Sequence, residues 1–332
     1  MKFKSGRLSN RNRLVNASQA LIVLFLISAC ERVVDQPENL TPEVTSDLAP
    51  AGLTMPAVWD TTELSSRPVS VAVAGGFGSQ IAIASETGSL QLFDFEGDRI
   101  TDPVEMAVQH ISTGRQVRLS DVPVTMFPGI NLAGDIQLFL HSGTMNEPIP
   151  YTVDIAQNGE AGGLCSGLPL NSTTELLALS YWTLEAPTTL QTGAIVEQGD
   201  DLVFVPGDTI ESTQAISACT IGQHGSAIYS APVEAAQVLE RNGRDHTILL
   251  DAAGQFSRVT QIGDREPLMI SPGLSIQVPH HSLDISGTGD ARTGGYPGGL
   301  IVLIGEIEPD TYRAVLVDPS PVTLDLFPDI ID

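Results

Sequence analysis

The side chains of this sequence that could do chemistry are mostly carboxylates. The 332 residues include 40 Asp and Glu but only 16 Lys and Arg, which gives a formal net charge of −24. Carboxylate oxygens suit hard divalent cations such as Ca²⁺, so a subset of these residues could form a cation site. The alternative is a solvated acidic surface, which is the commoner role of any one carboxylate. Composition alone leaves both interpretations open.

The other reactive side chains form weaker patterns. His280 and His281 are adjacent, so on a strand they point to opposite faces and cannot easily chelate one ion together. The stretch 287–290 contains glycines like a phosphate-binding loop, but no helix follows it, which favours an ordinary loop. Ser166 and Ser226 lie near glycines, yet no His and Asp pattern marks either as a nucleophile. None of these residues predicts a catalytic centre on its own.

Residues 1–29 have the pattern of a secretory signal peptide. A basic leader precedes the apolar run 20–27, which is too short to cross a bilayer as a stable helix. The run ends in Leu26-Ile27-Ser28-Ala29-Cys30, which resembles the bacterial lipobox. This resemblance implies cleavage before Cys30 and a lipid on its thiol, which would anchor the protein to a membrane. Glu31 in place of Asp implies an outer-membrane lipoprotein, with the periplasmic and the cell-surface face both open. An ordinary signal peptide with a chance Cys is the alternative.

The segment 30–66 is rich in Pro, Thr, Ser and acidic residues without periodicity, which predicts a flexible tether. Both lysines lie in the leader, so the chain from Cys30 onward has eleven basic residues, all Arg, against forty acidic ones, a net charge of −29. Affinity for nucleic acid depends on basic contacts that are scarce here. We therefore exclude a nucleic-acid function, and we expect a monomer.

The rest of the chain consists of short apolar or alternating runs separated by turn residues. Within 69–100, the runs Ser70–Ala74, Gln80–Ser85 and Leu90–Phe95 are bounded by Gly and Asp turns. No helical period of comparable length occurs in the chain after the leader, so the sequence predicts an all-β protein.

These runs form units of about four strands that repeat at roughly fifty residues, which is typical of a β-propeller. We expect residues 67–328 to form a β-propeller domain of four-stranded blades. One unit is predicted to take its strands from 218–250, and the last is predicted to begin with 272–278. Five blades fit the length better than six, and six stays open. A β-sandwich or jelly roll is the alternative fold.

Several segments of this body have counterparts, in the same order, in one known family. They are Gly88–Gly97 (GSLQLFDFEG), Gly163-Leu164-Cys165, Ala218-Cys219-Thr220, Leu283-Asp284-Ile285-Ser286 and Tyr296–Val302 (YPGGLIV). Together they resemble the β-propeller phytases, a calcium-dependent family of 3-phytases that hydrolyses phosphate esters of inositol phosphates. The resemblance implies a propeller fold, Ca²⁺ as cofactor and a phosphorylated small molecule as substrate.

The resemblance also implies site residues. Asp121 and Asp284 lie at matching family positions, which makes them candidate calcium ligands and candidate catalytic residues. Arg115 and Arg118 lie near the first of them and are candidate substrate contacts. In such a site, clustered Ca²⁺ ions offset the charge of the substrate and activate water.

Other positions depart from the family pattern. Ser217, Gly222 and the pair Ala231-Pro232 stand where the family has carboxylates, and no lysine is available to bind phosphate. Two carboxylates alone do not assemble a cluster of calcium ions. Two hypotheses follow: a phytase-like lipoprotein that hydrolyses phosphomonoesters, and a catalytically degenerate propeller that binds an envelope protein or glycan. A purely structural envelope lipoprotein is a third.

The lipobox uses Cys30, which leaves Cys165 and Cys219. An even pair in an oxidising compartment predicts a disulfide. The two residues also begin corresponding strands of neighbouring predicted units, which favours their pairing. Two buried free thiols are the alternative.

Overall fold

The computed structural model describes residues 52–76, 78–170, 174–199, 201–290 and 296–324. All described residues belong to one compact unit, Leu48–Asp332. The predicted signal peptide and Cys30 therefore lie outside the described residues. None of the described helices is long and apolar enough to cross a membrane.

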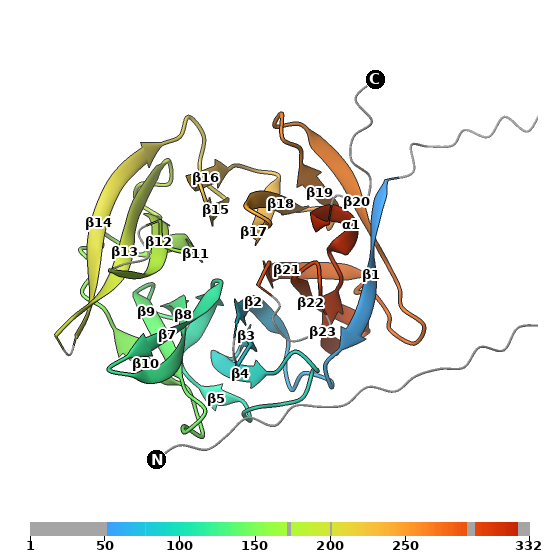
Figure 1. The fold of residues 1–332 in the computed structure, drawn as a ribbon, viewed down its shortest axis with the longest axis horizontal. Coiled ribbons are helices and arrows are strands. Elements are labelled where there is room, and N and C mark those ends of the chain that lie inside the picture. Colours follow the sequence, from blue (N-terminus) through green and yellow to red (C-terminus); the bar gives the residue numbers. More distant parts are fainter. Residues whose placement is uncertain (1–51, 77, 171–173, 200, 291–295, 325–332) are drawn as a thin grey trace, which may run out of the picture. The chain divides into compact units, whose positions relative to one another are not determined.

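The described residues are almost entirely β-structure, as predicted, and the one helix among them is α1 (Ser320–Thr323). The described strands form four hydrogen-bonded sheets, of eight, nine, four and two strands. For description we divide them into six groups of neighbouring antiparallel strands (Figure 1). Groups 1 to 3 are β2 (Pro68–Gly75), β3 (Gln80–Ser85), β4 (Ser89–Phe93) and β5 (Val104–Glu105); β6 (Val108–Ile111), β7 (Gly114–Leu119), β8 (Val122–Asn131), β9 (Ile136–His141) and β10 (Ile149–Thr152); and β11 (Ala161–Gly167), β12 (Glu175–Thr183), β13 (Thr189–Gln198) and β14 (Asp201–Glu211). Groups 4 to 6 are β15 (Ala218–Gly222) and β16 (Gly225–Tyr229); β17 (Val233–Arg241), β18 (Arg244–Asp251), β19 (Phe256–Val259) and β20 (Arg265–Ser271); and β21 (His281–Thr288), β22 (Leu300–Glu308), β23 (Thr311–Val317) and β1 (Leu53–Asp60).

Hydrophobic clusters join these groups in cyclic order. In group 1, Val71 and Val73 of β2 pack against group 6, whereas Ala72 and Ala74 pack against group 2. The alternation follows from the two-residue period of a strand, which sends successive side chains to opposite faces. Four further clusters lie between groups 2 and 3, 3 and 4, 4 and 5, and 5 and 6. The curled sheets therefore form a nearly closed, propeller-like β fold.

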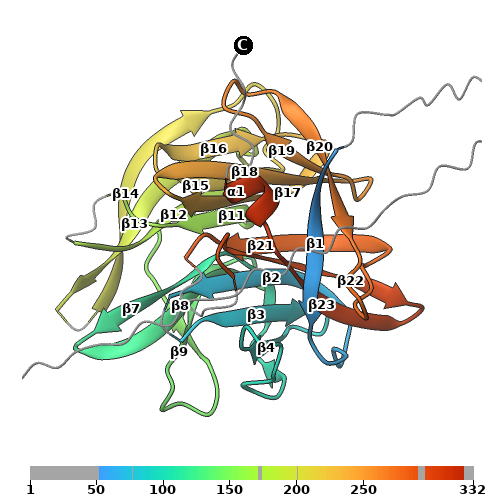
Figure 2. The same cartoon turned by 45° about the vertical axis from the view of Figure 1, so that its right-hand side comes forward.

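Strand β1 brings the beginning and the end of the described chain together. It pairs antiparallel with β23 and parallel with β20, and Figure 2 shows it running beside both. These residues lie inside the segment 30–66, so the prediction of a tether is wrong for Leu53–Asp60. Met55 and Ala57 are buried in the cluster between groups 5 and 6. The alternation of buried and less buried residues in β1 is short and lies next to a segment rich in Pro and Thr, so the sequence does not identify the strand.

Two of the predicted units also need correction. The segment 218–250 does not form one four-stranded sheet, because β15 and β16 make a separate two-stranded sheet while β17 and β18 pair with β19 and β20. The run Pro272–Val278 is not a strand, and group 6 instead begins at His281.

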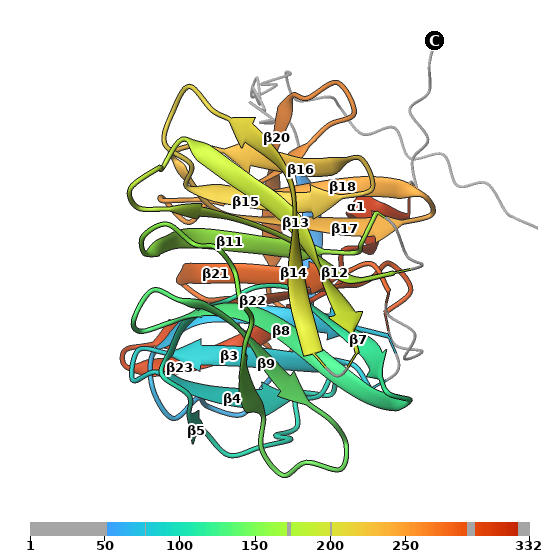
Figure 3. The same ribbon diagram turned by 90° about the vertical axis from the view of Figure 1, so that its left-hand side faces the viewer.

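The predicted disulfide is confirmed. Cys165 on β11 and Cys219 on β15 are bonded, with their Cα atoms 5.7 Å apart. Both residues begin neighbouring groups, and Figure 3 shows β11 and β15 next to each other. Gly167, two residues after Cys165, lets these strands approach closely, because a Cβ there would lie 2.8 Å from the Ile221 carbonyl oxygen.

Candidate functional site

The first strands of the six groups line two cavities. The strand-start cavity has a volume of about 440 Å³ and is lined by early residues of β2, β6, β11, β15, β17 and β21. The strand-end cavity, of about 530 Å³, is lined by later residues of β2, β11, β15, β17 and β21 and by the first residues of β7, Gly114–Gln116. Polar side chains of the strand-start cavity are Gln109, His110, Ser112, Thr113, Ser166, Ser217, Thr220, Glu234, Gln237, Asp284 and Ser286.

Three of the five residues that line both cavities are hydrogen-bonded to one another and form a constriction where the cavities meet. Thr113 Oγ1 donates a hydrogen bond of 3.0 Å to Gln237 Oε1, which joins group 2 to group 5. Ser166 Oγ of group 3 donates to the Thr113 carbonyl oxygen at 2.5 Å. The first bond spans groups 2 and 5, which are not neighbours, so it narrows the space where the two cavities meet.

Asp284 lies on β21 in the wall of the strand-start cavity and joins group 6 to group 1. Its Oδ2 accepts hydrogen bonds from the Val71 N–H at 3.0 Å and the Ser70 hydroxyl at 2.9 Å, and its Oδ1 accepts one from its neighbour Ile285 N–H at 2.8 Å. Ser286 Oγ accepts from Val73 N–H at 3.0 Å in the same manner. Side chains of β21 thus satisfy amide groups of β2 that no backbone partner reaches.

The protonation of Asp284 reflects its enclosure. Burial raises the pKa of this carboxyl above its ordinary value, against the opposing effects of the nearby His110 and of the hydrogen bonds from Val71, Ser70 and Ile285. Since a carboxyl without full solvation favours its neutral form, Asp284 is less readily ionised than a surface acid.

Ser70, His110 and Asp284 contact one another but do not form a nucleophilic triad. His110 Nδ1 lies 3.3 Å from Ser70 Oγ, and the same hydroxyl donates to Asp284 Oδ2. In a catalytic triad the His stands between the Ser and the acid, because it must take the hydroxyl proton. Here the Ser stands in the middle and is fully buried, so the cluster holds strands together.

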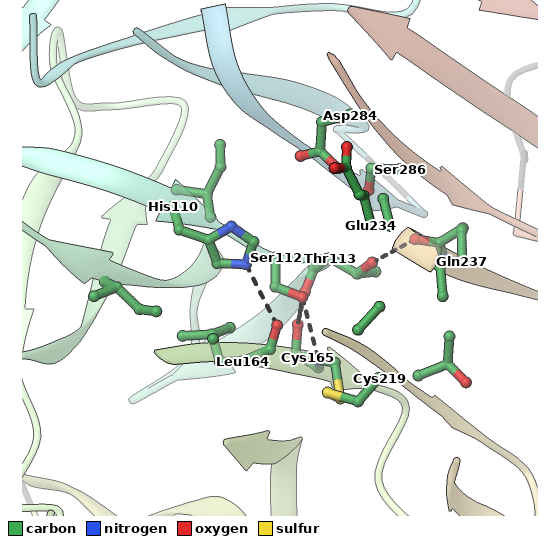
Figure 4. A pocket seen from close by; sticks show the side chains of 18 of the residues that line it. His110, Ser112, Thr113, Leu164, Cys165, Cys219, Glu234, Gln237, Asp284 and Ser286 are labelled. Atoms are coloured by element: carbon green, nitrogen blue, oxygen red, sulfur yellow. Dashed lines mark hydrogen bonds between the residues drawn. A yellow bond between two sulfur atoms is a disulfide. The ribbon is translucent and has the colours of Figure 1, made fainter. Parts of the chain in front are cut away.

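The cavity wall formed by β17 and β21 carries the acidic groups. Figure 4 shows Glu234, Asp284 and Ser286 on one side of the cavity, with Leu164 and Cys165 on another. Glu234 is exposed, whereas Asp284 is largely enclosed. Trp182 and Leu184 add apolar surface. Among the described residues that line this cavity there is no Arg or Lys.

The structure does not bring the candidate site residues together. Asp121 is exposed in the turn between β7 and β8, where Ser120 and Asp121 have positive φ angles of 45° and 72°, and it lines neither cavity. Arg118 is exposed near that turn and donates weakly to the Asp121 carbonyl oxygen at 3.4 Å. Arg115 lies in the strand-end cavity instead. Only Asp284 reaches the strand-start cavity.

These placements do not fit a calcium cluster. Asp284 already accepts three hydrogen bonds, which leaves little of its carboxylate for a metal. Among the described residues, no three His, Cys, Asp or Glu side chains come close enough to hold one ion. A Ca²⁺ ion needs six to eight oxygen ligands, so Asp121 and Asp284 do not supply a shared site.

Sequence reasoning missed His110, Glu234 and Gln237 as cavity residues. Each stands on a first strand, and a sequence signal was available, because early positions of the first strands of a propeller converge on one mouth. His110 lies on β6, but nothing in its flanking residues distinguishes it from a core histidine.

No protein-family model and no curated protein matches the chain. Among solved structures, a triple arginine-to-alanine mutant of AofleA from Arthrobotrys oligospora is similar, with a TM-score of 0.50 and 13% sequence identity. The similarity covers 76% of this chain and 83% of that one. At this identity the likeness bears on the fold alone.

Proposed function

We propose that this protein is a six-bladed β-propeller whose fourth blade is reduced to the hairpin β15–β16. Six hydrophobic clusters in cyclic order, and cavities lined by one strand from each of six groups, support six blades over five. In this interpretation the shortened blade is the fourth, and the blade formed by the chain after Leu274 has its full set of strands.

The function that the geometry supports best is binding of a small neutral or cationic polar ligand in the strand-start cavity. The observation that carries this proposal is the lining: hydroxyl, amide and carboxylate groups with no Arg or Lys among the described residues. Hydroxyls and amides suit the hydroxyl groups of a sugar, and Glu234 suits an amine. Trp182 is buried in the cluster between groups 3 and 4 and contributes only a small aromatic surface to the lining.

Charge argues against a phosphorylated ligand in the same cavity. The chain from Cys30 onward has a net charge of −29, and Glu234 and Asp284 face the cavity. An anionic ligand would be repelled there unless bound cations intervened, and the placement of Asp121 leaves those cations without a cluster of ligands. Calcium-dependent phytase activity is therefore the alternative that the experiment must test.

The site would be displayed in the cell envelope. The lipobox-like end of the leader supports a lipid anchor at Cys30 in the outer membrane, where a glycan is an available partner. Metabolic labelling with a tagged fatty acid checks this: label is expected on the wild-type protein and absent from Cys30→Ala. Equal labelling of both proteins would contradict the anchor.

Thermal-shift titrations with glucose, glucosamine and glucose 6-phosphate test the ligand class. We expect the two uncharged or cationic sugars to stabilise the protein, and Glu234→Gln to weaken glucosamine binding about fivefold. Glu308→Gln, an exposed acid outside the cavity, is the matched control and should bind like the wild type. Phosphate release from phytate with Ca²⁺, lost in both Asp121→Asn and Asp284→Ala, would instead establish the phytase alternative.

A further inference from the structure

The strand-end cavity is lined by two arginines that form no ion pair with a carboxylate among the described residues. Arg115 of β7 donates through one guanidinium nitrogen to the Leu176 carbonyl oxygen at 2.8 Å, and Arg241 of β17 donates to the Gly289 carbonyl oxygen at 3.1 Å. No ion pair joins either of them to a carboxylate in the part of the chain that the structure describes. The Nε of Arg241 is buried without a hydrogen-bond partner.

Unpaired guanidinium groups are unexpected on this protein. The chain from Cys30 onward has forty acidic residues for eleven arginines, so acidic partners are abundant. Taking a cation partly out of water costs free energy unless an opposite charge or a full set of hydrogen bonds compensates it. Burial accordingly lowers the pKa of Arg115, and no nearby carboxylate counters this effect.

The two arginines line the same cavity from different groups. Arg115 belongs to group 2 and Arg241 to group 5, and the carbonyl contacts fix one nitrogen of each while leaving other N–H donors available. The constriction formed by Thr113 and Gln237 lies where this cavity meets the one that is lined by Glu234 and Asp284.

We propose that the strand-end cavity binds an oxyanion, the carboxylate or phosphate group of a small molecule, held by the Arg115 and Arg241 guanidinium groups. Guanidinium forks match the geometry of both oxyanions, and such charge-assisted bonds are the stronger kind. Glu240 and Asp290 also line the cavity and oppose the anion, so the affinity falls in the millimolar range. This site is separate from the sugar or amine site of the strand-start cavity.

Binding is measured by NMR titration of the full-length protein with inorganic phosphate, and with acetate in a parallel arm, at constant ionic strength set by NaCl. Saturable binding of at least one anion is expected, and the two arms identify which oxyanion is preferred. Arg115→Gln and Arg241→Gln should each weaken it at least about tenfold. Arg258→Gln removes an equal charge from a surface ion pair with Glu266 and should leave it unchanged.

The proposal is overturned if neither anion binds saturably, or if Arg258→Gln weakens binding as much as the two cavity variants. Circular dichroism shows whether each variant folds. If one of them does not, a crystal of the wild-type protein soaked in phosphate decides the matter. Density at Arg115 and Arg241 supports the site, and density only elsewhere contradicts it. Neither result depends on whether sugars bind the other cavity.

Discussion

At the scale of single residues, Asp284 shows how a position that suggests chemistry can have a structural role. Its carboxylate accepts hydrogen bonds from the Val71 amide and the Ser70 hydroxyl, and two residues later the Ser286 hydroxyl oxygen accepts one from the Val73 amide. The strands β21 and β2 are therefore joined by side chains where no backbone ladder connects them. The carboxyl group still lines the strand-start cavity, so it contributes a polar group to that site without being a metal ligand.

Replacing Asp284 tests this role. Asp284→Ala leaves the Val71 amide without its acceptor, so we expect a loss of unfolding free energy on the order of 3 kcal/mol, measured by chemical denaturation. Asn adopts a positive φ angle as readily as Asp does, and position 121 is exposed, so Asp121→Asn should change the free energy of unfolding by less than about 0.5 kcal/mol. Equal losses in the two variants, together with a stabilisation by Ca²⁺ that the wild type shows and both variants lack, would show instead that the residues share an ion.

Tyr296 gives a pH-dependent test. Burial, together with Glu96, Asp318 and Asp94, raises its pKa from 10.0 to about 12, and its hydroxyl donates to the Phe95 carbonyl oxygen at 2.9 Å. Because the folded state holds this proton more tightly than the unfolded state, stability falls as pH rises from 10 toward 12. No lysine from Cys30 onward titrates in this window, so the tyrosines dominate it.

We expect Tyr296→Phe to cost about 1 kcal/mol at neutral pH, through the lost hydrogen bond. Its stability should fall less steeply than that of the wild type between pH 10 and 11. Tyr312→Phe is the control, and denaturation curves at several pH values provide the comparison. Parallel slopes for the wild type and Tyr296→Phe would show that this phenol is not protected.

At the scale of elements, the hairpin β15–β16 is the least supported of the six groups. It has two strands of five residues each, where most groups have four strands. Short two-stranded hairpins are marginally stable alone. The Cys165–Cys219 disulfide and the small clusters on either side therefore hold it in the ring.

Removing the disulfide should affect stability strongly. For a bond spanning 54 residues, loop-closure entropy predicts a loss on the order of 4 kcal/mol in the Cys165→Ala, Cys219→Ala double variant. Denaturation with and without reductant measures it, and reductant should not affect the double variant. A loss below about 1 kcal/mol would mean that packing alone retains the hairpin.

The close approach of β11 to β15 is a second test of this element. In Gly167→Ala the new methyl group would meet the Ile221 carbonyl oxygen at 2.8 Å and its Cβ at 2.9 Å. Forcing these strands apart should cost about 1–3 kcal/mol. Gly143→Ala has nothing within 4 Å and should be neutral or slightly stabilising. Similar melting temperatures for the two variants would contradict the tight packing.

At the scale of the whole molecule, local patterns predicted the strands but not how distant segments join. The alternation in Ser70–Ala74 and Gln80–Ser85 identified β2 and β3. The disulfide was predicted because two cysteines remain after Cys30 and the signal peptide implies an oxidising compartment. The pairing of Leu53–Asp60 with β20 and β23 depends on ring closure, which no local period encodes. For the same reason the sequence positions of Asp121 and Asp284 matched the pattern of the phytase family, although the structure does not bring the two residues together.

Charge at this scale distinguishes the two cavities. The strand-start cavity is lined by Glu234 and Asp284 and by no Arg or Lys among the described residues, whereas the strand-end cavity is lined by Arg115 and Arg241 beside Glu240 and Asp290. The constriction at Thr113 and Gln237 lies where the two cavities meet. A ligand with both a sugar or amine part and an anionic part would have to place the first part in the strand-start cavity and the second in the strand-end cavity. Ligand selectivity therefore tests the central claim that this is a binding module.

The most direct measurement is calorimetric titration of the Arg115→Gln, Arg241→Gln double variant, which isolates the strand-start cavity, with glucosamine and with glucose 6-phosphate. The account predicts that glucosamine binds and that glucose 6-phosphate does not, with the glucosamine affinity reduced about fivefold when Glu234→Gln is added. Tighter binding of glucose 6-phosphate than of glucosamine, strengthened by Ca²⁺, would contradict it and favour a phosphate-ester hydrolase.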